Sequence, residues 1–437
     1  MGINEKEAMD MKTSLLAGII ACLLLTLPAA ASDYTLEIFG NANEDDTINM
    51  QDVTYTELII LEYRDKTELA DAKHDGKINM QDVTQIELVI LGKEKEMTLL
   101  DMAGRVVTVN KPITKIASFS HGGEHIQIIK AIRAEEKIVA VDSDLQSYDF
   151  LKVLYPEISK LPDFGTSKSV DYEVLFEIKP DLVTKMGVAP LNELKPADQE
   201  IADTLKSGGI DIIFLGSRHP EELLKSARKL GYLLDRREEA DEFIDFYEEL
   251  INTIAERTKS IPEGDKLRVY VANCDKYRTA GVGTGYSAYL EMAGGRSISA
   301  EAGVIGAYTQ IDPEWLIEEN PDVFVMRPTY YIFPDYGSDD PAEASEVRDD
   351  ILNTPELANV KAIEDERVHL FGVSSTSAAS FLCIGYMAKW FYPELFEDLD
   401  MKAIHQDYLD RFQRLDFDVD EHGVFMYPAL YGPALTQ

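Results

Sequence analysis

Two short stretches of the chain carry oxygen-bearing side chains at a spacing that could hold a hard metal cation. A side-chain or backbone oxygen at positions 1, 3, 5, 7, 9 and 12 of a twelve-residue loop is the spacing that proteins use for calcium. The first loop offers Asn41, Asn43, Asp45, Thr47 through its backbone, Asn49 and Asp52. The sequence therefore predicts a calcium site in residues 41–52.

The second loop, residues 71–82, is the weaker of the two. It offers Asp71, Asp75, Lys77 through its backbone, Asn79 and Asp82. Lys73 stands where the spacing requires an oxygen, and its ammonium group would oppose a divalent cation. The first loop departs from the pattern at Asp46, because a glycine is expected at that sharp turn. Because Lys73 would oppose a cation in the second loop, we expect calcium in the first loop more than in the second.

Arginines and tyrosines at the ends of predicted strands indicate a different chemistry. In open α/β sheets, ligands bind beyond the carboxyl ends of the strands. The strand ends and the loops beside them hold Ser120, His121, Arg218, Tyr277, Arg278, Tyr286, Arg327, Tyr330 and Tyr331. Guanidinium and phenol groups together suit a large, flat or anionic ligand. These residues form the predicted ligand site, and the run 327–331 is its strongest part.

Two glutamates, Glu173 and Glu314, occupy the same place in two copies of one pattern, 141 residues apart. The copies read DYEVLFEIKPDLV (171–183) and DPEWLIEENPDVFV (312–325). Each begins with an aspartate that can cap a helix, and the glutamate follows in the first turn, where the helix dipole favours a carboxylate. Such a carboxylate is available for a surface contact. A helix-turn-strand unit used twice predicts two equivalent lobes.

The elements that must position these residues alternate between strand and helix through most of the chain. Strands are predicted at 115–119, 137–141, 181–185, 211–215, 267–273, 323–327 and 368–372. Helical patterns lie between them, so we expect parallel sheets covered by helices. Residues 221–261 read as almost unbroken helix. Its second part, 238–261, would form a rod of roughly 36 Å, which is long enough to join two lobes.

The body of the chain resembles the solute-binding proteins of ABC importers of the iron-complex, haem and cobalamin class. The resemblance rests on DMAGRVVTVNKPITKIASF (101–119), LEMAGGRSIS (290–299) and the two copies of the repeated pattern. It implies an α/β fold of two Rossmann-like lobes joined by a single long helix. The implied parts are an N lobe at about 98–219, linking helices at 221–261 and a C lobe at about 265–437.

The same resemblance implies how the protein would work. The ligand, an iron chelate such as a siderophore or haem, or a corrinoid such as cobalamin, would sit in the cleft between the lobes and be delivered to an ABC permease. Glu173 and Glu314 match the pair of carboxylates, one on each lobe, that dock onto arginines of the permease.

Residues 36–95 resemble a dockerin, the small module with two calcium loops that binds a cohesin partner. TINMQDVTYTELIIL (47–61) and KINMQDVTQIELVIL (77–91) are near copies, and amphipathic helices are predicted at 53–61 and 83–91. The resemblance implies a small, mainly helical EF-hand-type domain that would tether the protein to a cohesin-bearing surface. The alternative is a helical module that has lost calcium or its partner.

Composition limits the partners and the location. The net charge of −37 argues against nucleic acid and against charge-driven binding to anionic lipid. Residues 1–31 contain an apolar run at 13–27 and small residues after it, so they are predicted to be an export signal. We expect an exported protein at the cell surface or outside the cytoplasm, held by this segment if it is uncleaved. Cys274 and Cys383 could pair or stay free, and their spacing does not decide which.

Two other functions stay open. Histidines near the same strand ends would suit a receptor for a bare zinc or manganese ion, although the histidine-containing run of that class is missing. A dockerin-bearing extracellular hydrolase would need two carboxylates about 5–10 Å apart across a cleft, and no pair in the sequence stands out. The leading prediction is a binding protein without enzymatic activity.

Overall fold

The computed structural model describes residues 34–120, 122–187, 194–329, 335–372 and 378–430. Contacts divide the chain into two units, Met1–Ile90 and Leu91–Gln437. His121, Tyr330 and Tyr331 of the predicted ligand site lie outside the described residues, as does the predicted export signal at 1–31.

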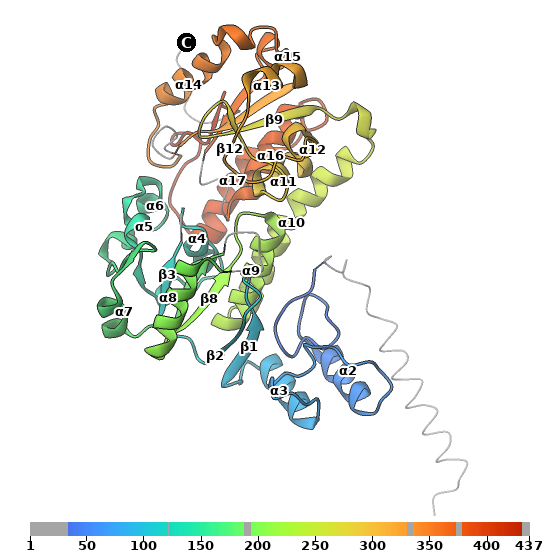
Figure 1. Cartoon of the computed structure of the whole chain (residues 1–437), viewed down its shortest axis with the longest axis vertical. Helices are drawn as coiled ribbons and strands as arrows, with labels where there is room; N and C mark the ends of the chain where they lie inside the picture. Colours follow the sequence, from blue (N-terminus) through green and yellow to red (C-terminus); the bar gives the residue numbers. More distant parts are fainter. Residues whose placement is uncertain (1–33, 121, 188–193, 330–334, 373–377, 431–437) are drawn as a thin grey trace, which may run out of the picture. The chain divides into compact units, whose positions relative to one another are not determined.

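The first unit contains one helix after each predicted calcium loop, α2 (Met50–Ile60) and α3 (Met80–Ile90), and the two helices pack against each other (Figure 1). Both begin three residues earlier than predicted. In the first copy the reason is a capping box: Asn49 accepts a hydrogen bond from the Gln51 N–H, and Asp52 accepts one from the Asn49 N–H. Asn49 and Asp52, which the sequence predicts as calcium ligands, therefore also cap the start of α2.

The second unit begins with an antiparallel hairpin of β1 (Glu96–Leu100) and β2 (Val106–Asn110). The four main strands of the N lobe then run parallel, in the order β4-β3-β7-β8. Their bounds are β3 (Ile116–Phe119), β4 (Ile138–Val141), β7 (Leu182–Met186) and β8 (Asp211–Leu215). A two-residue pair, β5 (Gly165–Thr166) and β6 (Ser169–Val170), lies outside this sheet.

Helices enclose the N-lobe sheet (Figure 1). They are α4 (Glu124–Ala131), α5 (Ser143–Ser147), α6 (Asp149–Leu154), α7 (Tyr172–Ile178) and α8 (Pro196–Ser207). Phe119, Phe164 and Phe214 are buried in a shared apolar cluster that contains residues from both the strands and the helices. Burial of the strands explains why their sequences read as continuous apolar runs rather than as alternating ones.

Two helices connect the lobes, α9 (Pro220–Leu234) and α10 (Arg237–Thr258). The helical stretch is interrupted at Asp235, which closes α9 in the left-handed conformation with φ of 59°. The 22 residues of α10 span about 33 Å. This helix contacts α4 of the N lobe and also α11 and α16 of the C lobe, so it is the element that joins them (Figure 1).

The C lobe has a mixed sheet in the order β12-β10-β9-β13-β14-β15, with β11 paired to β9. Its strands are β9 (Arg268–Asn273), β10 (Arg278–Thr279), β11 (Arg296–Ser297), β12 (Thr309–Gln310), β13 (Val323–Arg327), β14 (Val368–Phe371) and β15 (Met426–Tyr427). The predicted strands β9, β13 and β14 form its parallel centre. The antiparallel strands at the edges were not predicted, because two-residue strands leave no periodic pattern.

The helices of the C lobe lie between and after these strands. They are α11 (Gly285–Met292), α12 (Ile298–Glu301), α13 (Pro313–Glu319), α14 (Ala342–Leu352), α15 (Lys361–Glu364), α16 (Ser380–Phe391) and α17 (Met401–Tyr408). The chain continues after α17 as a π-helix over Leu409–Gln413.

The repeated sequence pattern builds the same local structure in both lobes. Asp171 caps α7, and Asp312 caps α13, by accepting hydrogen bonds from backbone N–H groups of the first turn. The two helices end at Lys179 and Asn320, which both adopt the left-handed conformation, with φ of 49° and 45°. The two copies therefore have the same kind of helix cap and the same left-handed residue at the helix end.

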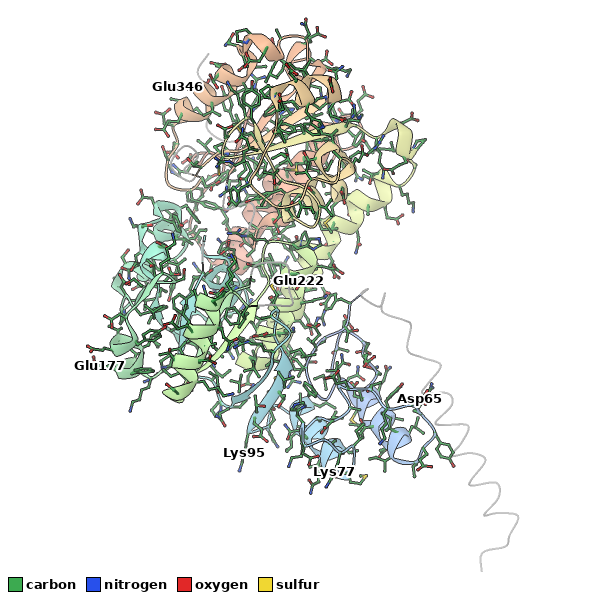
Figure 2. All side chains as sticks on the ribbon, in the orientation of Figure 1. Asp65, Lys77, Lys95, Glu177, Glu222 and Glu346 are labelled. Carbon is green, nitrogen blue, oxygen red and sulfur yellow. The ribbon has the colours of Figure 1, made fainter. Side chains whose placement is uncertain are left out.

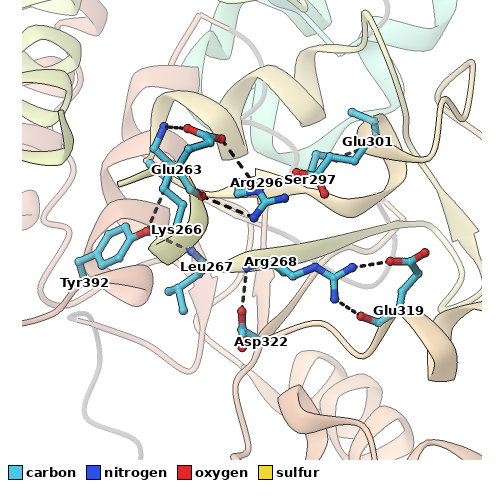
Figure 3. Close-up of polar contacts among 12 residues, drawn as sticks. Glu263, Lys266, Leu267, Arg268, Arg296, Ser297, Glu301, Glu319, Asp322 and Tyr392 are labelled. Atoms are coloured by element: carbon cyan, nitrogen blue, oxygen red, sulfur yellow. Dashed lines mark hydrogen bonds and ion pairs between the residues drawn. The ribbon is translucent and has the colours of Figure 1, made fainter. Parts of the chain in front are cut away.

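The aspartate of each Pro-Asp step has a second role, which is to fix a strand against its neighbour. Asp181 accepts hydrogen bonds from the backbone N–H groups of Thr114 and Lys115, just before β3. Asp322 accepts one from the N–H of Arg268, at the start of β9, over 2.9 Å (Figure 3). The repeat is thus a complete helix-strand unit whose aspartate sets the register of the sheet.

Candidate functional site

The two lobes touch where β8 ends and α11 begins. The Tyr289 hydroxyl of α11 donates a hydrogen bond of 2.6 Å to the backbone carbonyl of Arg218, which follows β8. Gly285, the first residue of α11, is pressed against the same carbonyl, and a Cβ at this position would lie 1.9 Å from that oxygen. The glycine is therefore required by this close approach of the two backbones.

Beside this contact lie four side chains that we call the arginine cluster: Glu124, Arg218, Tyr286 and Arg327. Glu124 and Arg218 come from the N lobe, and Tyr286 and Arg327 come from the C lobe. Glu124 Oε1 is 4.0 Å from Arg218 Nε, and the Arg327 guanidinium carbon lies 5.8 Å from the centre of the Tyr286 ring. The charges of both arginines act on the Glu124 carboxyl and on the Tyr286 hydroxyl. Two cationic groups from opposite lobes thus meet at one place.

Arg327 is held by the sheet that carries it. It ends β13 opposite Asn273, the last residue of the neighbouring parallel strand β9. Its Nη1 donates to Asn273 Oδ1 over 3.0 Å and to Cys274 Sγ over 3.2 Å, and only 3% of the residue is exposed. Cys274 has φ of 66°, a strained conformation for a residue with a side chain. A buried arginine with fixed neighbours is preorganised to bind an anion.

Glu124 is the member of the cluster that sequence reasoning missed. It is the first residue of α4 and is buried, and it accepts a hydrogen bond of 3.1 Å from the Ser120 hydroxyl. Burial raises the pKa of its carboxyl, while Arg218, Ser120 and Arg327 oppose that rise. The signal in the sequence was its place, right after the strand that ends at Phe119 and a Gly-Gly turn. Its first-turn position made it look like an ordinary helix carboxylate.

Three further ionisable side chains lie at the same end of the N-lobe sheet. Burial raises the pKa of Asp142, just after β4, to about 7. Lys185, near the end of β7, pairs with Asp198 over 3.4 Å, and its ammonium lies 5.1 Å from the centre of the Phe119 ring. Burial lowers the pKa of His125 to about 4, so this ring is neutral at physiological pH.

The remaining predicted ligand residues fall into two groups. Ser120 contacts the arginine cluster through its bond to Glu124. Tyr277 instead packs against the apolar core of the C lobe, and its hydroxyl donates to Glu356 over 2.8 Å. Arg278 lies on β10, opposite Gln310 of the antiparallel strand β12. The structure therefore brings together Arg218, Tyr286, Arg327 and Ser120, while Tyr277 turns to other partners.

The paired glutamates of the repeat are both exposed, Glu173 on α7 and Glu314 on α13. Each lies in the first helical turn, where its backbone N–H is bonded to the capping aspartate over 3.1 Å and 2.9 Å respectively. Glu177, one turn further along α7, also points outward (Figure 2). The first-turn carboxylates are therefore fixed at their base and accessible at their tip.

In the first calcium-type loop, Asp52 accepts hydrogen bonds from both ends of the loop. This buried carboxylate accepts hydrogen bonds from the N–H groups of Asn43 and Asn49, over 3.1 and 2.8 Å. Burial, with a contribution from the nearby charge of Asp45, raises the pKa of Asp52 to about 6. Asn41 Oδ1 is buried without a hydrogen-bond partner. An unsatisfied oxygen and two neighbouring carboxylates are a donor set that fits calcium.

The second loop repeats the arrangement with more exposure. Asp82 accepts from the N–H groups of Lys73 and Asn79, over 3.0 and 2.8 Å. Asp71 accepts from the N–H groups of Asp75 and Gly76. Gly76 has φ of 84°, whereas Asp46, its counterpart in the first loop, has no positive φ, so the missing glycine costs the first loop no strain. Across the described residues, no three His, Cys, Asp or Glu side chains are grouped to hold a metal ion.

The structure also bears on cysteine pairing and on membrane-crossing helices. Cys274 and Cys383 are both free thiols, so they do not pair with each other. In the described part of the chain, no helix combines the length and the apolar character needed to cross a membrane.

Comparison with known proteins places this site in a family. The family model described as periplasmic binding protein matches residues 120–372, more than half of the chain. The molybdate-binding protein MolA of Haemophilus influenzae is 24% identical over 345 residues, which cover 74% of this chain and 92% of that protein.

Solved structures share the fold. MolA bound to molybdate aligns with a TM-score of 0.59 and 22% identity, over 73% of this chain and 98% of that one. The TroA-like periplasmic binding protein FepB of Veillonella parvula gives 0.60 and 22%, over 75% and 98%. Helicobacter pylori CeuE with Ni(II) bound gives 0.57 and 19%, over 73% and 97%.

The matched region contains all four members of the arginine cluster and both copies of the repeat. Relatives of this kind are transport components that act outside the cytoplasm and catalyse no reaction. The chain therefore belongs to the periplasmic binding protein family and is a solute-binding component of an ABC transporter.

Proposed function

We propose that this protein captures an anionic, metal-containing solute between its lobes and delivers it to the permease of its transporter. The observation that carries the proposal is that Arg218 and Arg327, from opposite lobes, both act on Glu124 and Tyr286, with Arg327 buried and Arg218 partly exposed. A buried guanidinium needs an anion, and hydrogen bonds between charged groups are about twice as strong as neutral ones. In a chain with a net charge of −37, two such cations in one cleft are selective for a negatively charged ligand.

An iron chelate is our first candidate for that ligand. Ferric siderophores are anionic, and haem carries carboxylates around a flat apolar ring. Tyr286 lies under Arg327 and offers the aromatic surface that a ring or a catecholate could use. A corrinoid such as cobalamin stays a prediction, because it offers the two arginines less negative charge than a ferric siderophore or haem does.

An oxyanion of a metal is the second candidate, and a specific observation favours it. The relative MolA is named for binding molybdate, and the match covers 92% of its length. Molybdate shares with ferric chelates a negative charge and a metal centre, and it is much smaller than a ferric siderophore or haem. The two arginines suit both kinds of ligand, which differ in size.

Calorimetric titration of the purified protein decides between these ligands. The panel consists of a ferric tricatecholate, haem, cobalamin, sodium molybdate and sodium sulfate. We expect one of the metal-containing anions to bind in the micromolar range or tighter, and sulfate to bind far more weakly. Binding of zinc or manganese alone would replace this proposal with a bare metal-ion receptor, and release of sugar from a polysaccharide would replace it with a hydrolase.

For delivery, we propose that Glu173 and Glu314 dock onto the permease. Both carboxylates are exposed, are fixed by the same capping geometry and occupy equivalent places in the two lobes. The hydrogen bond to each capping aspartate fixes the backbone from which the glutamate side chain extends.

For the first unit, we propose that the loop 41–52 holds calcium and that the unit binds a cohesin-type partner as a dockerin does. The donor set around Asp52 supports the calcium part, because Asn41 Oδ1 lacks a partner and the carboxylates of Asp45 and Asp52 repel each other. Met50 and Met80 are more than half exposed at matching places of the two helices, which supports a surface for a protein partner. Mixing the protein with a cohesin domain, with and without calcium, tests both parts.

A further inference from the structure

The arginine cluster contains a carboxyl group that a simple anion site would not need. Glu124 lies 4.0 Å from Arg218 and is within reach of the charge of Arg327. An ionised Glu124 cancels one of the two positive charges and competes with any anion for the same guanidinium groups. The residue is 4% exposed and held by Ser120, so it cannot turn out into solvent without losing that bond.

We propose that Glu124 takes up one proton when the ligand binds, so that the cleft receives an anion of two or more charges together with a proton. The inference rests on the proposed function, since it assumes that the ligand is an anion held by Arg218 and Arg327. The proton passes from a buffer acid to a carboxylate oxygen of Glu124. The neutral acid then donates its O–H to an oxygen of the ligand instead of repelling it.

The charges in the cluster explain why binding and protonation are coupled. Without ligand, the arginines and the Ser120 hydroxyl stabilise the Glu124 carboxylate against the cost of burial. A ligand that binds both guanidinium groups removes that stabilisation and adds negative charge beside the carboxyl. Burial already raises the pKa of Glu124, so these two changes move it further in the same direction.

Other ionisable groups around the cluster are less suited to this role. Tyr286 stays neutral, because burial raises its pKa, and His125 stays neutral, because burial lowers its pKa to about 4. Lys185 is paired with Asp198. Cys274 accepts a hydrogen bond from Arg327. Among the described residues, Asp142, with its pKa near 7, is the competitor that must be tested, although its Oδ1 is committed to capping α5 through the Leu145 N–H.

The coupling has a measurable consequence for affinity. If one proton binds with the ligand, the association constant falls by up to tenfold for each unit of rising pH, within the range where Glu124 is ionised in the free protein and protonated in the complex. The cleft would then load best in mildly acidic surroundings and release its ligand more readily as the pH rises.

Calorimetry in two buffers of different ionisation enthalpy counts the protons directly. The titrants are sodium molybdate and a ferric tricatecholate, measured from pH 5 to 8.5 with the full protein. We expect the wild type to take up close to one proton per ligand in part of this range. Glu124→Gln, which keeps the size and can still accept from Ser120, should take up none and should bind with an affinity that no longer depends on pH.

Two matched variants make the result specific to Glu124. Asp142→Asn, which preserves the helix cap, should retain the proton uptake, and so should Glu177→Gln, which alters an exposed carboxylate of the same lobe. Loss of uptake in Asp142→Asn, with uptake retained in Glu124→Gln, overturns the assignment. Ligand binding without proton uptake at any pH in the wild type also overturns it, whether or not Glu124→Gln folds. If neither titrant binds the wild type, the proposed function itself is wrong, which is a different outcome.

Discussion

The hydroxyl of Tyr289 donates a 2.6 Å hydrogen bond to the backbone carbonyl of Arg218, and this bond joins a helix of the C lobe to a loop of the N lobe. The side chain of Arg218 extends from the same residue toward Glu124. Arg218 therefore belongs both to the contact between the lobes and to the predicted ligand site. A change in the relative position of the lobes would move its guanidinium group within the arginine cluster.

Gly285→Ala tests this connection. The new methyl group would lie 1.9 Å from the Arg218 carbonyl, so α11 and the loop after β8 must separate. We expect a loss of about 1–3 kcal/mol in stability, as for other overpacked sites, and ligand binding weakened by at least tenfold. Small-angle scattering and calorimetry measure both effects. Gly264→Ala is the control, since nothing lies within 4 Å of its added Cβ, and an equal loss there would refute the explanation.

Arg327→Lys separates charge from geometry. Lysine keeps the positive charge but cannot reproduce the planar fork that bonds Asn273 and Cys274 and lies beside Tyr286. We expect ligand affinity to fall by about 10- to 100-fold, which is the range for losing one charged hydrogen bond. Arg296→Lys, on a partly exposed arginine of the same lobe that pairs with Glu301, should bind as the wild type does. Unchanged affinity in Arg327→Lys would mean that the ligand binds elsewhere.

Charge reversal at the repeated glutamates separates transport from binding. The double variant Glu173→Arg with Glu314→Arg should abolish uptake by a reconstituted transporter and leave ligand affinity unchanged, because both residues are exposed and outside the arginine cluster. The matched variant changes Glu177 and Glu318, which are exposed one turn later on the same helices. Equal loss of transport in the matched variant would indicate a general need for negative charge rather than a specific contact.

Calcium binding to the first unit should depend on pH through Asp52. Its pKa is raised to about 6, so without calcium the folded state holds a proton that the unfolded state loses near pH 4. Stability of the unit therefore falls by about 3 kcal/mol as the pH rises from 4 to above 6. Calcium, which needs the ionised carboxylate, should bind better at pH 7 than at pH 5 and restore that loss.

Hydrogen exchange of the α2 amides and calcium titration of the whole protein measure these effects. Asp52→Asn should abolish binding at the first loop. Asp82→Asn is the matched change in the second loop, and it should remove less of the bound calcium, because Lys73 weakens that loop. Equal losses from the two variants would show that Lys73 does not matter.

The sequence was most informative where local chemistry decides the structure. The buried strands β8 and β13 were predicted to the residue, because a parallel sheet covered by helices needs continuous apolar runs. The starts of α2 and α3 were missed, because Asn49 and Asp52 serve both loop and helix cap. Strands β10, β12 and β15 were missed, since their pairing depends on neighbours far away in the sequence.

The same distinction applies to the site. Arg218 and Arg327 could be predicted, because both follow or end strands whose carboxyl ends carry ligand sites. Tyr277 was expected beside them, but the antiparallel strand β10 turns the chain back, and the tyrosine bonds Glu356 instead. Glu124 could not be separated from the many carboxylates at helix starts, because its role depends on two arginines that arrive about 90 and 200 residues later.

The aspartates of the two Pro-Asp steps, Asp181 and Asp322, anchor copies of one unit to their own sheets, and each copy presents one acidic tip. The two tips therefore stand on units of the same local structure and offer equivalent contacts. A partner built from two equal halves could then receive the loaded protein in either of two orientations, related by a half-turn. Orientation is a major limit on how fast proteins associate, so internal duplication would raise the fraction of collisions that succeed without strengthening any single contact.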